Sequence, residues 1–339
     1  MEFWRRKKEK GKARKCFLKN GSVFLQKLIA DCNGMSNPIR MFTSDQIKKA
    51  TNHFDPNCSL PELSSKYSYL WFTLYKGVIE GRSYVIKRFT KKTGVEGEET
   101  TYNDFVLSLR VSNHSFFLKL IGSCLEFPLP VLVFEDLEYR ALNIRGSVGP
   151  EDGPVLPWNV RLKIAKEVAT AITYLQTAFP RIIVHRNIKP TNVFLDKNGT
   201  AKLTAFSLAV TLPEGKTWIK DTVAGTYGYG DPIYFKTGVL TEYSDVFSFG
   251  ILMLILLLGR PLGSDGSDGN FYNNILDYVK DLRERGEPVE FGGGSNDMSP
   301  GQMKMFLELA LRCCEERNED RTKMILVAKQ IKLIEQASL

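Results

Sequence analysis

The chain has 339 residues, of which 43% are hydrophobic and 25% are charged, and its formal charge is +8. These proportions are ordinary for globular proteins, and the length is enough for one bilobal domain or two small ones. The six cysteines show no Cys-x-x-Cys spacing, and the three histidines lie far apart in the sequence. Neither a disulfide framework nor a metal site is therefore indicated, and a reducing cytosol is the expected compartment.

The positive charge is concentrated near the N-terminus, where nine Lys or Arg fall within the first 20 residues. One interpretation is a solvated, frayed terminus. The other is a peripheral tether to an anionic membrane surface, in which each cation adds about 1 kcal/mol. No apolar core follows the basic start, so we expect no signal peptide. Glu2 excludes N-myristoylation, while Cys16 is a candidate for palmitoylation.

The first part of the chain is rich in predicted strands. Aromatic and β-branched residues crowd residues 67–89, and two turn signals divide them, which predicts a strand meander. The expected elements are, in chain order, a helical stripe at 23–29, a short helix capped by Thr43 or Ser44, strands within 67–89, a helix at 100–112 and two strands within 117–137.

The second part is predicted to be mainly helical. Apolar residues recur at three- and four-residue spacings across residues 156–179, which indicates a long amphipathic helix. The run at 249–259 is too short to span a bilayer, which takes about 20 residues, and predicts a buried core helix. Further helices are expected at 245–258, 272–285, 302–315 and 322–336. The chain is therefore predicted to be α+β and bilobal, with an N-terminal extension (1–44), a β-rich lobe (45–136) and a helical lobe (137–339).

Six segments in order resemble the plant receptor-like kinase group of protein kinases, from about residue 45 to residue 337. They are "YVIK" with Lys87, "LVFED" with Glu135, "HRNIKPTN" with Asn187 and Asn192, "GTYGYGDP" at 225–232, "SDVFSFG" at 244–250, and "EDRTKM" with Arg321. The resemblance implies the bilobal kinase fold. It also implies that Lys87, Glu135 and Asn192 occupy positions that contact ATP or its metal ion in active relatives.

The positions that carry catalysis depart from the pattern of this group. Asn187 stands where the catalytic aspartate accepts a proton, and a neutral amide cannot do this. Ala205 replaces the aspartate that holds Mg²⁺, and Ser207 replaces the glycine after it. No glycine lies between Gly34 and Gly77, where a flexible loop should cover the phosphates; bulky residues fill this region instead, namely Tyr69, Trp71 and Phe72.

The losses are large in energetic terms. A positioned base contributes about 10² to 10⁴ in rate, and a catalytic metal ion several kcal/mol of charge stabilisation. The resemblance therefore implies a pseudokinase with no required cofactor and at most vestigial ATP binding. A weakly active atypical Ser/Thr kinase, with Lys87 and Asn192 as its remaining contacts and Asp104 as the partner of Lys87, stays open as the alternative.

Two further departures concern the activation segment, residues 205–233. Ile233 replaces a glutamate that normally pairs with Arg321, so we expect Arg321 to find another acceptor or to face solvent. With Ala205 and Ser207 at the other end, both anchors are expected to be weak. Five residues of the segment are candidates for contacting a partner protein: Lys216, Trp218, Lys220, Tyr227 and Tyr229.

The order of motifs over nearly the full chain resembles, more narrowly, the small plant resistance-related pseudokinases. The segments that carry this are "CFLKNGSVFLQKLIADCNG", "PIRMFTSDQIKKATNHF", "SNHSFFLKLIGSC" and "LPEGKTW". The resemblance implies a cytosolic adaptor in plant defence and innate immunity. Its expected partners are the leucine-rich repeats of a coiled-coil NLR immune receptor and an effector-modified, for example uridylylated, receptor-like cytoplasmic kinase. No nucleic-acid partner is expected.

Overall fold

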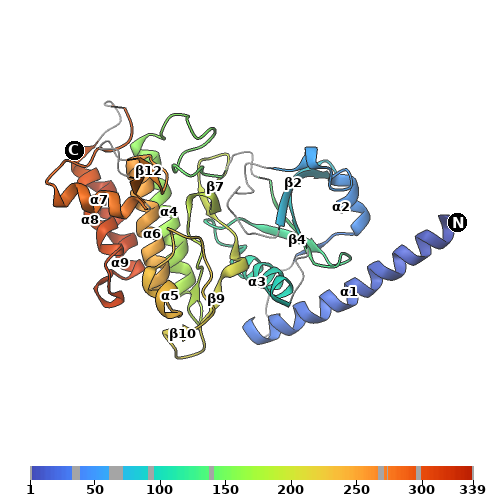
Figure 1. Ribbon diagram of the computed structural model, residues 1–339. Coiled ribbons are helices and arrows are strands. Elements are labelled where there is room, and N and C mark those ends of the chain that lie inside the picture. The colour runs from blue at the N-terminus through green and yellow to red at the C-terminus, as the bar shows by residue number, and fades with distance from the viewer. Residues whose placement is uncertain are drawn as a thin grey trace. The chain divides into compact units, whose positions relative to one another are not determined.

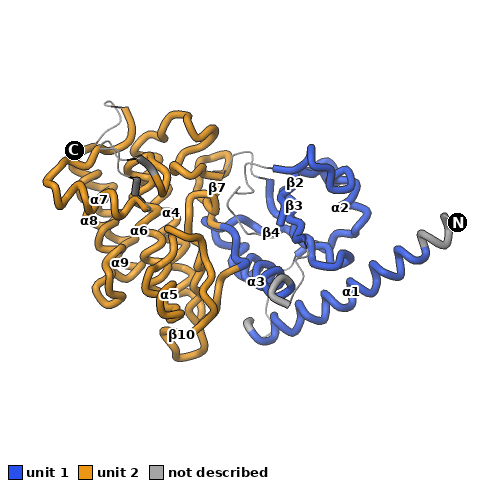
Figure 2. The backbone as a smooth tube through the Cα atoms, in the orientation of Figure 1, with its two compact units in different colours: residues 1–138, 204–207 blue, residues 139–203, 208–339 orange. Residues whose placement is uncertain are grey.

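The computed structural model describes residues 2–32, 39–60, 72–90, 95–136, 141–265, 271–272, 274–294 and 299–337. The chain forms two compact units (Figure 2). Unit 1 comprises residues 1–138 together with 204–207, and unit 2 comprises residues 139–203 and 208–339. Unit 1 is built around a sheet and unit 2 around helices, which agrees with the predicted α+β, bilobal architecture.

Within its described residues, unit 1 contains one five-stranded sheet and the helices α1, α2 and α3, which Figure 1 labels. In chain order its elements are α1 (Glu2–Cys32), β1 (Arg40–Met41), α2 (Ser44–Ala50), the 3-10 turn η1 (Pro56–Cys58), β2 (Phe72–Ile79), β3 (Arg82–Phe89), α3 (Val95–Val111), β4 (Leu120–Cys124) and β5 (Val131–Glu135). The expected strands and the short helix are present. The strand β2 begins at Phe72, and residues 67–71 lie outside the described part of the chain.

The sheet has the strand order β1-β4-β5-β3-β2. All neighbouring pairs are antiparallel except β1 with β4, which run parallel. A Cβ atom at Gly122 would overlap the carbonyl oxygen of Arg40, so glycine is required for β1 to approach β4. The short helix α2 begins at Thr43 with a capping box that Gln46 completes. Its Ile47 is fully buried in the apolar cluster beneath the sheet.

The basic N-terminal segment forms helix α1, which does not fit the frayed terminus that was one of its two interpretations. One side of α1 packs on the rest of unit 1. The Asn20 amide donates to the carbonyl oxygens of Leu125 and Phe127, both at 2.8 Å, and accepts from the Tyr102 hydroxyl at 2.6 Å. Phe24 stacks on Phe105 of α3, with ring centroids 4.1 Å apart. These tertiary contacts hold a helix whose two glycines, Gly11 and Gly21, lower its intrinsic helix propensity.

Unit 2 is mainly helical (Figure 1). Its helices are α4 (Trp158–Thr177), α5 (Pro232–Thr237), α6 (Glu242–Leu258), α7 (Ile275–Glu284), α8 (Pro300–Cys313) and α9 (Met324–Gln336), with 3-10 turns at Pro190–Asn192 and Asn318–Asp320. Its short strands are β6 (Ile183–Val184), β7 (Val193–Leu195), β8 (Ala201–Leu203), β9 (Val210–Thr211), β10 (Trp218–Lys220), β11 (Val239–Thr241), β12 (Ser264–Asp265) and β13 (Phe271–Tyr272). A further 3-10 turn, Phe206–Leu208, falls where the chain passes from unit 1 to unit 2.

Helix α6 forms the centre of unit 2, as its apolar sequence predicted. Every residue from Ser244 to Leu258 is buried, and α4 and α8 pack against it. A Cβ atom at Gly250 would come within 2.5 Å of the Cys314 sulfur, so this glycine permits the close approach of α8. Among the described helices, none combines the length and the apolar character that crossing a membrane requires.

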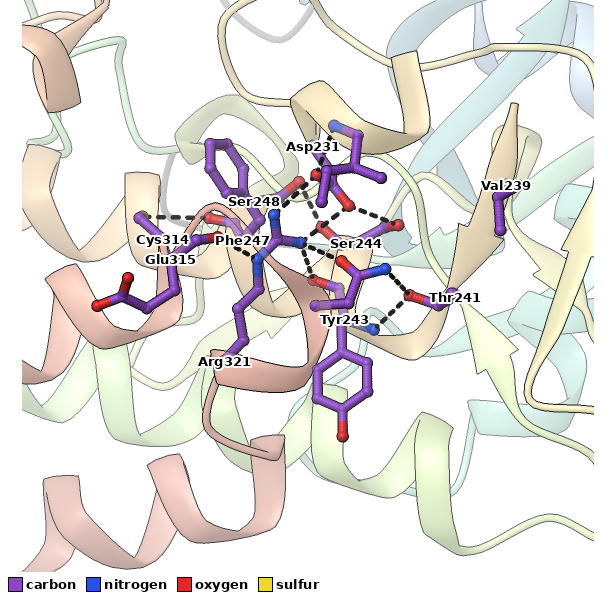
Figure 3. Close-up of polar contacts among 12 residues, drawn as sticks. Asp231, Val239, Thr241, Tyr243, Ser244, Phe247, Ser248, Cys314, Glu315 and Arg321 are labelled. Carbon is purple, nitrogen blue, oxygen red and sulfur yellow. Dashed lines mark hydrogen bonds and ion pairs between the residues drawn. The ribbon is translucent and has the colours of Figure 1, made fainter. Parts of the chain in front are cut away.

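Arg321 keeps an ion-pair partner although Ile233 cannot provide one, as expected of a buried guanidinium. Its side chain pairs with Asp231 at 2.9 Å, and both side chains are almost fully buried (Figure 3). The guanidinium also donates to the carbonyl oxygens of Glu315 and Tyr243. Asp231 in turn accepts from the Ile233 backbone amide and thereby caps the N-terminus of α5. One carboxylate therefore both starts a helix and neutralises a buried cation.

We predict that Asp231→Ala lowers the free energy of unfolding by about 3–5 kcal/mol, because it leaves a buried guanidinium without its counter-charge. Asp231→Asn keeps an acceptor for the helix cap and should still lose most of this stability. The matched control is Asn274→Ala, which removes only the N-cap of α7 and should cost about 1 kcal/mol. Urea denaturation measures all three. Equal losses for Asp231→Ala and Asn274→Ala would show that the cap alone matters.

Candidate functional site

Lys87 of β3 forms a buried ion pair inside unit 1. Its ammonium lies 2.5 Å from the Asp104 carboxylate of α3, and the two residues are only 3% and 0% exposed. A shorter acid at the expected position on the helix therefore reaches the lysine. Charges buried this deeply require a partner of opposite sign. Lys87 and Asp104 provide that partner for each other, without any ligand.

The Asp104 carboxylate is also bound by two hydroxyl groups. Ser207 donates to the same oxygen as Lys87 at 2.7 Å, and Ser108 donates to the other oxygen at 3.1 Å. The neighbouring Asn103 amide donates to the Phe206 carbonyl oxygen at 2.9 Å. The sequence indicated Ser207 only as the replacement of a glycine. In the structure its hydroxyl is a hydrogen-bond donor to Asp104. Helix α3 and residues 206–207 are joined at two adjacent points.

Aromatic rings cover the Lys87 ammonium on another side. The nitrogen lies 3.7 Å from the centroid of the Phe72 ring and 5.2 Å from that of Phe89. Phe72 belongs to the region where the sequence lacks the expected glycines; Tyr69 and Trp71 lie outside the described residues. The carboxylate and the π-faces thus stabilise the buried ammonium without a ligand.

The position of the missing metal ligand contains only a methyl group. Ala205 is buried, and its backbone φ of 72° lies in the left-handed region. Such a conformation is uncommon for a residue other than glycine. No group of three or more His, Cys, Asp or Glu that could hold a metal ion occurs within the parts of the chain that the structure describes. The residues present therefore do not fit Mg²⁺, whose usual protein ligands are carboxylates.

Glu135 ends β5, where its backbone pairs with Tyr84 of β3. Its carboxylate accepts from the Lys119 backbone amide at 3.1 Å, and its own amide donates to the Lys119 carbonyl oxygen at 3.0 Å. These contacts belong to the sheet edge and give Glu135 a structural role within unit 1.

Asn187 is fixed within its own loop in unit 2. Its side-chain oxygen accepts from the Thr226 hydroxyl at 2.7 Å, and its backbone oxygen accepts from the Asn192 amide at the same distance. Both contacts are ones that a neutral amide or hydroxyl can make. Lys189 of the same loop is buried, and burial lowers its pKa to about 8. Asn187 and Asn192 thus close the loop upon itself.

Asp245 of α6 holds the start of this loop. Its carboxylate accepts from the backbone amides of His185 at 2.6 Å and Arg186 at 2.9 Å. Complete burial raises the pKa of Asp245 to about 7, although the two amides favour the ionised form. The Asp245 carboxylate therefore fixes the backbone of His185 and Arg186, where the loop begins.

The activation segment has anchors that the sequence analysis missed. Arg186 pairs with Asp221 at 2.8 Å and donates to the Leu208 carbonyl oxygen. The Tyr234 hydroxyl donates to the Thr222 carbonyl oxygen at 2.8 Å and accepts from the Ala224 amide at 3.0 Å. The expectation of a weakly anchored segment is thus wrong. Phosphorylation often positions such segments by pairing phosphate with arginine, and the Asp221 carboxylate supplies a permanent negative charge to Arg186.

Two of the five candidate partner-binding residues lie on one strand of the two-stranded sheet formed by β10 and β11. Strand β10 pairs antiparallel with β11, with Ile219 opposite Leu240. Leu240 is buried, and Ile219 packs with it into the local apolar cluster. Because side chains alternate along a strand, Trp218 and Lys220 share the opposite face. Both are exposed, Trp218 by 54%. The alternation in "TWIK" could have predicted this pairing from the sequence.

The other three candidates differ in their exposure. Lys216 is exposed in the turn that precedes β10, and Tyr227 is 78% exposed. Tyr229 is buried, and burial raises the pKa of its hydroxyl. Tyr229 is therefore not available at the surface, which corrects its inclusion among the partner-binding candidates.

The chain is similar to known proteins over nearly its whole length. Residues 73–332 match the protein kinase domain family. The chain is 52% identical to serine/threonine-protein kinase ZRK1 of Arabidopsis thaliana, over 97% of this chain and 95% of that protein. It is 51% identical to non-functional pseudokinase ZRK2 (98% and 93%) and 45% identical to non-functional pseudokinase ZED1 (98% and 99%), both of Arabidopsis thaliana. The chain therefore belongs to the protein kinase domain family, in the group that contains ZRK1, ZRK2 and ZED1.

Proposed function

We propose that the chain is a pseudokinase adaptor of the cytosol in plant defence. In this role it links the leucine-rich repeats of a coiled-coil NLR immune receptor to an effector-modified receptor-like cytoplasmic kinase, its client. Two relatives that match nearly the whole chain are named non-functional pseudokinases, which supports the loss of catalysis. The partners rest on the narrower family resemblance.

The observation that carries the proposal is the way the remaining kinase residues are occupied. Lys87, Asp104 and Ser207 bind one another in a buried network, and the Lys87 ammonium faces the Phe72 ring. The Asn187 side chain is engaged by Thr226. With the metal ligand replaced by a methyl group, these groups stabilise the fold through contacts with one another. A kinase fold kept in this way is suited to binding.

The exposed face of the two-stranded sheet formed by β10 and β11 is the surface that best suits a modified client. Trp218 and Lys220 lie on one exposed face, and Lys216 and Tyr227 are exposed in the same segment. Lysines pair with phosphate and aromatic rings stack on bases. A client that carries a nucleotide, for example a uridylyl group, presents both features. We therefore assign client binding to Lys216, Trp218, Lys220 and Tyr227, without Tyr229.

A weakly active Ser/Thr kinase is the second candidate. The Lys87–Asp104 pair favours it because active relatives use a lysine–acid pair to position ATP. One relative, ZRK1, carries the name of a serine/threonine-protein kinase. This alternative requires that the Phe72 ring move and that Asn192 leave its bond to Asn187.

We predict no phosphotransfer from ATP by the purified chain. Asn187→Asp should also remain inactive, because it restores the base but neither the metal ligand at position 205 nor the loop glycines. Transfer of labelled phosphate to the chain itself and to a general substrate measures this. Activity of the natural chain that disappears in Lys87→Ala would instead establish the weak-kinase alternative.

We predict that ATP with Mg²⁺ leaves the thermal unfolding midpoint unchanged. A ligand present at 100 times its dissociation constant would stabilise the folded state by about 2.7 kcal/mol. If the midpoint does not rise, the dissociation constant for ATP must therefore be well above one hundredth of the ATP concentration used. Phe72→Ala is the informative variant, because it uncovers the Lys87 ammonium. A clear Mg²⁺-dependent shift in the natural chain would contradict the occupied network as the reason for inactivity.

We predict that Lys216→Ala, Trp218→Ala and Lys220→Ala, made together, weaken binding of a uridylylated client by about 2 kcal/mol, or roughly thirtyfold. Titration calorimetry with the modified and unmodified client measures this. The control is Lys304→Ala, Lys329→Ala and Leu333→Ala, which removes two exposed cations and one exposed apolar side chain from α8 and α9. Undiminished binding by the variant with Lys216, Trp218 and Lys220 replaced would place client recognition elsewhere. It would not affect the proposal that the chain lacks catalysis.

A further inference from the structure

Helix α1 has one side with no function in the preceding account. Its packed side faces unit 1 through Asn20 and Phe24. With 3.6 residues per turn, residues seven or eleven positions apart share a side of a helix. Leu18, Leu25 and Ile29 therefore lie together, roughly opposite Asn20 and Phe24. They are 62%, 56% and 57% exposed, respectively. Unusually for exposed positions, three large aliphatic side chains line one side of a single helix.

The same helix carries most of the excess positive charge of the chain. Between residues 7 and 19 there are seven cationic residues and one acidic residue, Glu9. Lys12, Arg14 and Lys15 are exposed and lie within about two turns of Leu18. Lys19 is the member of this set that pairs with unit 1, through Glu98 at 2.9 Å. The outer surface of α1 thus has a basic N-terminal half and an apolar C-terminal half.

This combination matches the surface of an anionic bilayer in two ways. Cationic side chains are attracted to acidic headgroups. Exposed aliphatic side chains on one side of a helix can enter the boundary between headgroups and acyl chains while the helix lies flat. A groove on a partner protein would not require so large an excess of one charge. The packed side remains bound to unit 1, so the helix does not have to detach.

We propose that the exposed surface of α1, formed by Lys12, Arg14, Lys15, Leu18, Leu25 and Ile29, binds the surface of a membrane that contains acidic phospholipids. The basic half provides long-range attraction and the apolar half provides shallow insertion. The contact is peripheral, and it holds the chain at a membrane independently of any phosphotransfer.

The test is sedimentation of the full chain with vesicles of phosphatidylcholine, with and without about 30% phosphatidylserine. We expect binding only to the acidic vesicles, weakening as added salt shortens the screening length. Lys12→Gln, Arg14→Gln and Lys15→Gln together should lower the partition coefficient by about fivefold per charge, or roughly a hundredfold. Leu18→Ser, Leu25→Ser and Ile29→Ser together should abolish the binding that persists at high salt. Both variants alter exposed positions and should keep the natural unfolding midpoint.

The matched control is Lys323→Gln, Lys329→Gln and Lys332→Gln, which removes the same charge from exposed positions at α9. This variant should bind acidic vesicles like the natural chain. Equal losses in the two charge variants would mean that net charge alone attracts the lipid and would overturn the proposal. Binding to neutral vesicles as strong as to acidic ones would also overturn it. So would tighter binding of a short DNA duplex that depends on the three α1 cations.

Discussion

The ion pair between Lys87 and Asp104 is the interaction on which the organisation of unit 1 depends. It joins the central sheet to helix α3, and Ser207 extends it to the chain segment that returns from unit 2. A buried pair of this kind costs desolvation energy, which its partners must offset. Here the offset comes from a second hydroxyl donor and from the ring of Phe72. Residues typical of ATP handling have become the internal polar core of the unit.

Unit 2 follows the same principle with different residues. Arg321 and Asp245 are buried ionisable groups, and both are bound by groups of the same unit. Arg321 uses Asp231, which lies two positions before the expected glutamate site at residue 233. Asp245 uses two backbone amides of the loop that contains Asn187. These charges hold the loop and the activation segment in a kinase-like arrangement, which explains how the fold persists when the catalytic groups do not.

The same constraint explains which surfaces are free to evolve new contacts. Residues inside the networks cannot change without exposing an unpaired charge. The exposed face of β10, with Trp218 and Lys220, and the outer side of α1 lie outside these networks. In each element only the opposite face packs on its own unit. The activation segment is held by Arg186 with Asp221 and by Tyr234. A segment positioned by its own carboxylate can present a binding surface without being phosphorylated first.

Much of the fold was predictable from the sequence, because strands and helices leave periodic patterns. Helices α4 and α6 came within a few residues of their expected bounds, and strands β3 to β5 lie within the ranges where strands were expected. The helical state of the basic N-terminus was not predictable in this way. Its stability comes from Asn20 and Phe24 packing on α3, which are contacts between residues some 80 positions apart.

The residue types at the motif positions were enough to predict the kinase family and the loss of the base and the metal ligand. What the replacement residues contact became visible only in the folded chain. Ser207 donates to Asp104, Asp231 replaces the lost partner of Arg321, and Tyr229 is buried while Tyr227 is exposed. The reason is physical: a motif specifies the residue type, whereas hydrogen bonding and burial depend on neighbours that are distant in the chain and meet only on folding.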